Sequence, residues 1–260
     1  MSRKNWWKYL FDQKYLDTYL TMFSKTRTRE EVTFIIKVTH LKRDKKILDL
    51  ACGFGRHSIE FGKKGFKVTG LDYSRFLLKK AGADAKKAHV KIKFIRGDMR
   101  KLASQGNFDL VTSLFTSFGY FSQKDNLGVL KRIHKSLKSG GQLFLDVINA
   151  DAVKKRFLKE GIKEKHSKLL KIEQVIMMGK FLVNEIECFD QAKGEIRNHR
   201  EWRDKDKKKE YNYYLKVYTA KQYKKMLNDA GFKTKHIWSD FKGKPYKINA
   251  TRIRILAEKK

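Results

Sequence analysis

Cysteine, proline and acidic residues are all scarce in this 260-residue chain. Its two cysteines, Cys52 and Cys188, are too few for a disulfide framework or a four-thiolate zinc site, and this indicates a reducing compartment. No apolar run approaches the roughly 20 residues that a helix needs to cross a bilayer. The first residues, Met1–Trp7, also lack the apolar stretch and cleavage site of a signal peptide. We therefore expect a soluble, cytoplasmic protein without membrane insertion.

The shortage of acidic residues leaves a large positive charge. Lys and Arg number 61 against 28 Asp and Glu, which gives a formal net charge of +33. Clustered cations bind nucleic-acid phosphates through counterion release. Here the excess is spread evenly along the chain, and abundant lysine with a single proline is also what an AT-rich coding sequence produces. We therefore favour a small-molecule partner and keep RNA as the alternative.

The apolar pattern predicts helices first and then an alternation of strands and helices. Apolar residues recur at spacings of three and four through the first 43 residues. Beyond them the pattern predicts strands at 46–50, 66–71, 90–95, 108–114 and 142–148, and helices at 56–64, 75–88 and 124–138. Strands that alternate with helices at this spacing indicate an α/β fold with a parallel sheet covered on both faces.

The alternation stops after the fifth strand. Two alternating segments, 185–190 and 195–202, flank a polar turn and predict the arms of an antiparallel hairpin. A helix at 219–230 and strands at 232–241 and 252–258 close the chain. We accordingly divide the chain into N-terminal helices (1–43), a core (44–149), an inserted lid (150–215), and a C-terminal helix with the last two core strands (216–260).

The segment Asp49-Leu-Ala-Cys-Gly-Phe-Gly55 carries the clearest chemical signal. It follows the first strand and opens a helix, and its two glycines let a ligand approach the backbone. Asp72 ends the second strand, where a carboxylate can accept both hydroxyls of a ribose, and Asp98 follows the third. A nicotinamide dinucleotide fits less well, because Ser58 replaces the third glycine and an acid would face the pyrophosphate. A cationic, amine-bearing ligand suits Asp49 better.

These elements, in this order, resemble the class I S-adenosylmethionine-dependent methyltransferases, over nearly the whole chain. The segments Gly55-Arg-His57 and Phe115-Thr-Ser-Phe-Gly-Tyr-Phe121 are similar to those of a bacterial and archaeal subgroup. The resemblance implies a Rossmann-like, doubly wound, seven-stranded and mostly parallel sheet, with N-terminal helices over the cofactor and an inserted antiparallel lid. It also implies S-adenosylmethionine as the cofactor.

The resemblance further implies a set of cofactor contacts. The methionine part would lie against Ala51, Gly53 and Gly55, with backbone contact from Leu114. Asp72 would hold the ribose, and we expect its carboxylate to be exposed in the free protein. Tyr73 would flank the adenine, Asp98 would accept a hydrogen bond from the adenine amine, and the N–H of Met99 would lie close to the ring. Tyr15 and Arg27 would fold over the cofactor from the N-terminal helices.

The implied reaction is in-line displacement of a methyl group from a sulfonium. Proximity and alignment do most of this work, and a base is needed only if the acceptor must lose a proton. Tyr120 and His57 are the catalytic candidates, although neither need be obligatory. Ser113-Leu-Phe-Thr116 stands where base-directed amino methyltransferases carry an Asn-Pro-Pro-Tyr-type motif, which disfavours that activity. No spacing of Cys, His or carboxylates indicates a metal.

Three hypotheses follow. The aromatic segment and the lid favour a methyltransferase that acts on a small molecule. The charge alone favours an RNA- or protein-directed methyltransferase. A cofactor-binding protein without catalysis is the least favoured, because the loop and both later acids are intact.

Overall fold

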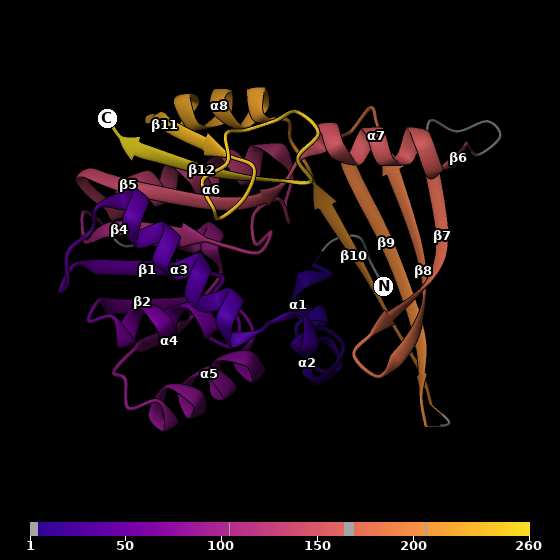
Figure 1. Cartoon of the computed structure of the whole chain (residues 1–260), viewed down its shortest axis with the longest axis horizontal. Coiled ribbons are helices and arrows are strands. Elements are labelled where there is room, and N and C mark those ends of the chain that lie inside the picture. The colour runs from indigo at the N-terminus through magenta and orange to yellow at the C-terminus, as the bar shows by residue number, and fades with distance from the viewer. Residues whose placement is uncertain (1–4, 104, 164–168, 206) are drawn as a thin grey trace.

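Two β-sheets stand side by side in the computed structural model, which describes residues 5–103, 105–163, 169–205 and 207–260 (Figure 1). The larger sheet has seven strands in the order β11-β12-β5-β4-β1-β2-β3, and only β12 runs antiparallel to its neighbours. Its strands are β1 (Lys46–Leu50), β2 (Lys67–Asp72), β3 (Lys93–Arg96), β4 (Phe108–Ser113), β5 (Leu137–Ile148), β11 (Phe232–Trp238) and β12 (Arg252–Lys259). The predicted doubly wound, seven-stranded and mostly parallel fold is confirmed.

Helices cover both faces of this sheet. The helices are α3 (Lys25–Thr39), α4 (Arg56–Lys63), α5 (Arg75–Lys87), α6 (Gln123–Ser136) and α8 (Ala220–Asp229). Successive strand residues point to opposite faces. Ile47 therefore packs with Val32 and Phe61 of α3 and α4, whereas its neighbour Leu48 packs with Leu130 of α6 and the residues of α8. Helix α5 contacts α4 and the strands β2 and β3.

One strand begins earlier than the sequence pattern predicts. Helix α6 ends at Ser136 and β5 starts at once with Leu137, whereas the pattern predicts a helix to 138 and a strand only from 142. The pairing of β5 with β4 shifts register along this stretch. Gly140 has a φ of +67° there, so glycine allows the strand to bulge where the sequence indicates a break.

The inserted segment forms a second sheet that has more strands than the predicted hairpin. After α7 (Ala150–Glu160) come β6 (Ile162–Lys163), β7 (Leu169–Met178), β8 (Phe181–Asp190), β9 (Glu195–Asp204) and β10 (Lys207–Lys216). They form an antiparallel sheet in the order β10-β9-β8-β7-β6, which we call the lid sheet. The predicted hairpin is β8 and β9. The sequence missed β10 because its first residues, Lys207–Lys209, have the composition of a charged turn.

The N-terminal helices lie between the two sheets (Figure 1). They are α1 (Trp7–Leu10), α2 (Gln13–Tyr19) and a 3₁₀ turn, η1 (Leu20–Met22), while a second 3₁₀ turn, η2 (Met99–Lys101), follows β3. Trp6, Trp7 and Leu10 pack with lid-sheet residues that include Trp202 and Tyr211. The helices thus fill the space between the core and the lid sheet. No helix in the described part of the chain is long and apolar enough to span a membrane.

Candidate functional site

An open cavity of about 880 Å³ lies at the carboxyl edge of the large sheet. This is the edge at which open α/β sheets bind ligands. Its lining includes most of the residues predicted for the site: Tyr15, Asp49, Ala51, Gly53, His57, Asp72, Tyr73, Asp98, Met99, Leu114 and Tyr120. Gly55 and Arg27 are not among the lining residues. We call this space the cofactor cavity.

Asp49 is the most deeply placed carboxylate of the cavity. Its side chain is 2% exposed at the end of β1. It accepts hydrogen bonds from the Ser58 hydroxyl at 2.6 Å and the Thr112 hydroxyl at 3.2 Å. These two bonds from α4 and β4 offset part of its desolvation and fix the carboxylate toward the cavity.

Asp72 is buried, so the expectation that its carboxylate is exposed is wrong. The residue is only 7% exposed. One carboxylate oxygen accepts the Gly53 N–H and the other accepts the Ser74 N–H, each at 2.8 Å. These bonds draw the glycine loop over the end of β2. Burial raises the pKa of Asp72 to about 6, although the two N–H bonds act in the opposite direction.

Asp98 is held by an arginine two residues later. The Arg100 guanidinium donates to the Asp98 carboxylate, with Nη2 at 2.6 Å from Oδ2. Burial would raise the pKa of Asp98, but hydrogen bonds from Arg100 lower it overall. The guanidinium also lies over the rings of Trp7 and Phe121, at 5.0 and 4.5 Å from their centroids. Trp7 in turn packs edge-on against Tyr73 at 4.7 Å, which fixes that side of the cavity.

The two glycines of the loop have different roles. Gly53 has a φ of +57° and an open position, since the nearest atom to a Cβ there would be 3.8 Å away. Gly55 has a φ of +77°, and a Cβ there would lie 2.9 Å from the Cβ of Ala81 and 3.1 Å from the Phe94 ring. Gly53 therefore presents backbone to the cavity. Gly55 lets α4 start close against α5 and β3.

A buried ionic cluster lies behind the cavity. Glu31 of α3 is 2% exposed and accepts from Arg27 Nε at 2.9 Å, Arg56 Nη1 at 2.7 Å and His57 Nε2 at 2.7 Å. Arg56 and His57 line the cavity, whereas the Arg27 side chain is 44% exposed. The structure thus brings Arg56, not Arg27, to the cavity wall. Arg56 also donates to the Thr28 hydroxyl at 2.9 Å.

Burial and the contacts within this cluster together set the pKa values of Glu31 and His57. Burial would raise the pKa of Glu31, but the His57 hydrogen bond and the Arg56 charge hold it well below its usual range. Burial and the neighbouring Arg56 lower the pKa of His57, only partly offset by Glu31. Since a carboxylate only accepts, the Nε2 of His57 carries the proton in this contact. That nitrogen is therefore occupied by its hydrogen bond to Glu31.

A second cavity adjoins the first across an aromatic partition. It is open to solvent and holds about 630 Å³ of empty space including that opening, and we call it the aromatic chamber. Four residues line both spaces: Phe11, Tyr15, Phe115 and Tyr120. The Phe11 ring contacts both tyrosines, with centroids at 5.0 Å from Tyr15 and 5.8 Å from Tyr120. Burial raises the pKa values of Tyr15 and Tyr120, so both phenols stay protonated at neutral pH.

Sequence reasoning missed part of the cavity wall. Arg56 was noted only within the Gly55-Arg-His57 segment, and its partner Glu31 stands 25 residues away, so no local spacing signals the pair. Phe23 of the N-terminal region was also missed, although it packs at 4.8 Å from Phe115. The Arg56 guanidinium lies 4.9 Å from the Phe23 ring centroid. A basic residue directly after a glycine loop is the only signal that pointed this way.

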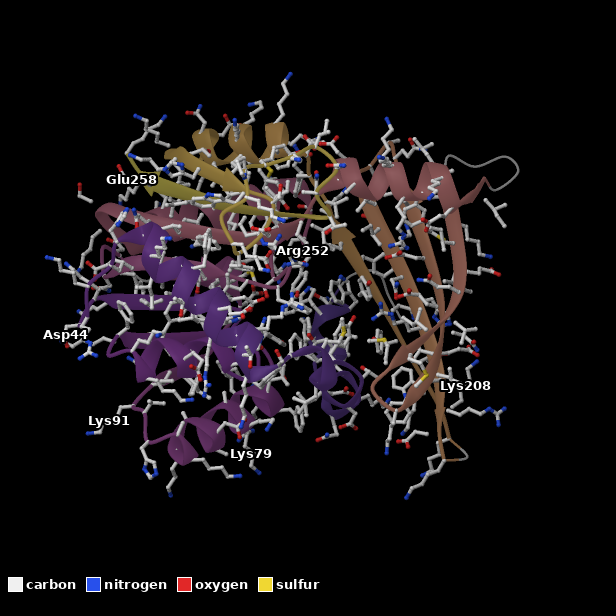
Figure 2. The ribbon with its side chains drawn as sticks, viewed as in Figure 1. Asp44, Lys79, Lys91, Lys208, Arg252 and Glu258 are labelled. Carbon is white, nitrogen blue, oxygen red and sulfur yellow. The ribbon has the colours of Figure 1, made fainter. Side chains whose placement is uncertain are left out.

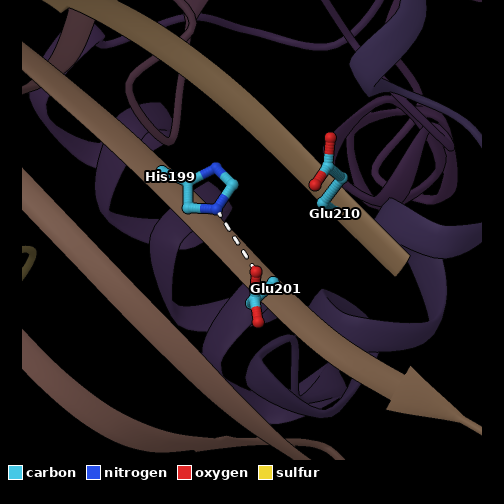
Figure 3. Close-up of side chains that lie close together, drawn as sticks. All are labelled: His199, Glu201 and Glu210. Carbon is cyan, nitrogen blue, oxygen red and sulfur yellow. Dashed lines mark ion pairs between the residues drawn. The ribbon is translucent and has the colours of Figure 1, made fainter. Parts of the chain in front are cut away.

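Among the described residues, one group brings a histidine and two carboxylates together. One potential ligand atom each from His199 and Glu201 of β9 and Glu210 of β10 lies within 4.8 Å of the others (Figure 3). They alternate with the buried Asn198 and Arg200, so they lie on the other face of the lid sheet. Lys208 already pairs with Glu201 at 2.7 Å. The group therefore joins ordinary surface ion pairs, and we assign no metal to it.

Part of the chain resembles known methyltransferases. Residues 47–141 match the family model described as a methyltransferase domain. A glycine/sarcosine N-methyltransferase from Aphanothece halophytica is 35% identical over 144 residues, which cover 54% of this chain and 53% of that protein. The chain thus spans about half the length of that relative.

Two solved structures show the same fold over nearly the full length. The CcbJ methyltransferase from Streptomyces caelestis superposes with a TM-score of 0.79 at 16% identity, covering 99% of this chain and 98% of the other. The S-adenosylmethionine-bound amino pentose methyltransferase CalS10 from Micromonospora echinaspora gives 0.63 at 18%, covering 92% of each chain. Residues 47–141 therefore resemble a methyltransferase domain, and the chain as a whole shares the fold of these two methyltransferase structures.

Proposed function

We propose that the protein transfers a methyl group from S-adenosylmethionine to a small-molecule acceptor. The observation that carries this proposal is the cofactor cavity itself. One space gathers the Gly53 backbone with Asp49, Asp72 and Asp98, and it shares an aromatic wall with a second chamber. A donor site beside an acceptor site is the arrangement that group transfer needs.

The residues of the cavity fit this cofactor. The donor carries an ammonium and a sulfonium, and three carboxylates in the lining favour a cation. Asp72 has each oxygen engaged by one N–H, which leaves lone pairs for the two ribose hydroxyls. Tyr73 and Met99 would flank the adenine, with Asp98 accepting from its amine. Bound S-adenosylmethionine would supply an activated methyl group.

Arg56 would bind the carboxylate at the other end of the donor. It is the basic residue of the lining, and Glu31, Thr28 and the Phe23 ring hold its guanidinium in place. This assignment differs from the sequence expectation, which gave Arg27 a role at the cofactor. Arg27 instead adds a third donor to Glu31 from the solvent side.

Tyr120 is better placed than His57 to contact the acceptor. Its ring lies in the partition and lines both spaces, whereas His57 lines only the cofactor cavity and is committed to Glu31. A protonated phenol can orient an acceptor by donating or accepting a hydrogen bond. We therefore give Tyr120 an orienting role and His57 a positioning role toward Arg56, with no obligatory base.

A basic groove keeps a nucleic-acid acceptor as the second candidate. It runs along the edge strand β3 and is lined by Lys46, Lys67, Lys86, Lys91, Lys93, Arg96 and Lys101. It meets the cofactor cavity at Leu71, Gly97 and Asp98, on the side opposite the aromatic chamber. The labelled lysines of Figure 2, Lys79, Lys91 and Lys208, project from separate parts of the surface. The dispersed charge and the groove's position favour the small-molecule acceptor.

Binding and transfer experiments test the proposal separately. Calorimetry should show binding of S-adenosylmethionine and of its demethylated product, and negligible binding of nicotinamide dinucleotides. Incubation with methyl-labelled donor and fractionated cell extract should then label a small-molecule fraction. Tight dinucleotide binding with no heat from the sulfonium donor contradicts the cofactor assignment. Label found only in RNA or protein fractions contradicts the acceptor class.

A further inference from the structure

The aromatic chamber and the cofactor cavity have opposite charge. Three carboxylates line the cofactor cavity. Among the described residues that line the chamber, none is Asp or Glu, and Arg252 is the only charged side chain. Most of the remaining lining is aromatic: Trp6, Phe11, Tyr15, Tyr19, Phe115, Tyr120 and Tyr213. A chamber of this composition favours a ligand with an apolar body and one anionic end.

The arginine shares its carboxylate partner with a second arginine. Arg252 and Arg254, on β12, both pair with the single carboxylate of Asp146 on β5, at 2.7 and 3.1 Å. Asp146 is 2% exposed and also accepts the Phe115 N–H at 3.0 Å. Asp146 therefore serves two guanidinium groups, and the negative charges of Glu31 and Asp240 also act on Arg254. Of the two arginines, only Arg252 lines the chamber.

Arg252 also retains hydrogen-bonding capacity. Its guanidinium has five N–H groups. Four are used by Asp146 Oδ1, Asp146 Oδ2, the Asp146 backbone oxygen and the Thr116 hydroxyl. One Nη1 hydrogen remains, and the group lies 5.4 Å from the centroid of the Phe115 ring, which separates the two cavities. Figure 2 shows Arg252 where the large sheet meets the lid sheet.

We propose that Arg252 binds an anionic group of the methyl acceptor, so that the acceptor is a carboxylate-bearing small molecule. This inference rests on the proposed function, because it takes the aromatic chamber as the acceptor site. The carboxylate would lie at Arg252, and the rest of the acceptor would pack on the aromatic walls toward Tyr15 and Tyr120. The partition then places the opposite end of the acceptor beside the cofactor cavity.

Benzoate and benzamide provide a matched test, because they share a ring and differ in charge. Each is titrated calorimetrically into protein saturated with S-adenosylhomocysteine. Wild-type protein should bind benzoate at least about tenfold more tightly than benzamide. Arg252→Gln should reduce this ratio to near one. Arg254→Gln is the matched control: it removes one charge from the same Asp146 outside the chamber, and should change the ratio less than about threefold.

Arg252 also supports the turn at Thr116, so a variant that retains the charge is included. Arg252→Lys keeps the charge but loses the guanidinium bonds to Asp146 and Thr116 that fix the remaining N–H toward the chamber, and it should lower the ratio by about three- to tenfold even if Arg252→Gln does not fold. A wild-type ratio near one, or an unchanged ratio in both Arg252 variants, overturns the inference. If wild-type protein does not bind S-adenosylhomocysteine at all, the proposed function fails instead.

Discussion

Replacement of Asp72 by Asn should remove a loss of stability that the free protein suffers as the pH rises, while weakening cofactor binding. Burial raises the pKa of Asp72 from 3.8 to about 6, so the fold favours the protonated carboxyl. A group with a raised folded pKa contributes stability below its unfolded pKa, and that contribution is lost as the pH rises through the folded value. A pKa difference of about two between the folded and unfolded states corresponds to a loss of roughly 3 kcal/mol of unfolding free energy at pH values well above 6. About half of this loss develops between pH 5 and pH 8.

Asp72→Asn removes this pH-dependent contribution to the unfolding free energy. It also changes the unfolding free energy by a fixed amount, because a donor NH₂ group replaces one acceptor oxygen. The fixed amount cancels when the stability difference between variant and wild type is compared at two pH values. Urea denaturation at pH 5 and pH 8 should therefore show that difference move in favour of the variant by about 1–2 kcal/mol. The affinity for S-adenosylmethionine at pH 8 should fall by about 2–4 kcal/mol, because charged acceptor bonds are worth about 1.5–3 kcal/mol each.

Asp98→Asn is the matched control, since it removes a second carboxylate from the same cavity. Arg100 holds the pKa of Asp98 below its usual range, so this variant should gain no stability as the pH rises. Parallel stability curves for wild type and Asp72→Asn from pH 5 to pH 8 would refute the burial argument. Wild-type cofactor affinity in Asp72→Asn would refute the ribose role.

Three further changes test the packing, the ionic cluster and the charge. Gly55→Ala should lose about 2–4 kcal/mol of unfolding free energy through backbone strain and overpacking, whereas Gly128→Ala in the open face of α6 should gain up to about 1 kcal/mol in the same urea assay. Glu31→Gln should lose about 3 kcal/mol at pH 7 because Arg56 stays buried without its partner, and this difference should shrink as the pH falls below about 4, through the lowered pKa of Glu31. Replacement of the four basic residues of Lys205–Lys209 by Gln should leave the affinity for S-adenosylmethionine unchanged. Retention of RNA on filters by the wild-type protein should collapse between low and physiological salt. Tight RNA binding at physiological salt would favour an RNA acceptor.

The local sequence predicted the core because its signals are short-range. Apolar alternation identifies β1 and its parallel neighbours, and a glycine-rich turn between a strand and a helix has few other uses. An acid at the end of each of the first three strands necessarily meets the same sheet edge in a parallel sheet. Asp49, Asp72 and Asp98 therefore line one cavity, as expected.

Sequence patterns did not predict the features that depend on contacts between distant segments of the chain. The lysine-rich start of β10 has no strand pattern of its own, and only pairing with β9 orders it. The burial of Asp72 depends on the Gly53 N–H, which folds back over β2 from 19 residues away.

The sequence by itself determined the fold of the core and the acid-and-glycine series of the cofactor cavity, because both follow from the period of the strands and from adjacent residues. The tertiary structure alone decided that Arg56 rather than Arg27 reaches the cavity, since Glu31 of α3 orients Arg56 from another helix and holds Arg27 one turn away on its own helix. It also decided the aromatic chamber, whose walls come from the N-terminal helices, the loop after β4 and the lid sheet. Burial and charge at such a junction depend on how separate elements pack, and no local pattern of residues encodes that.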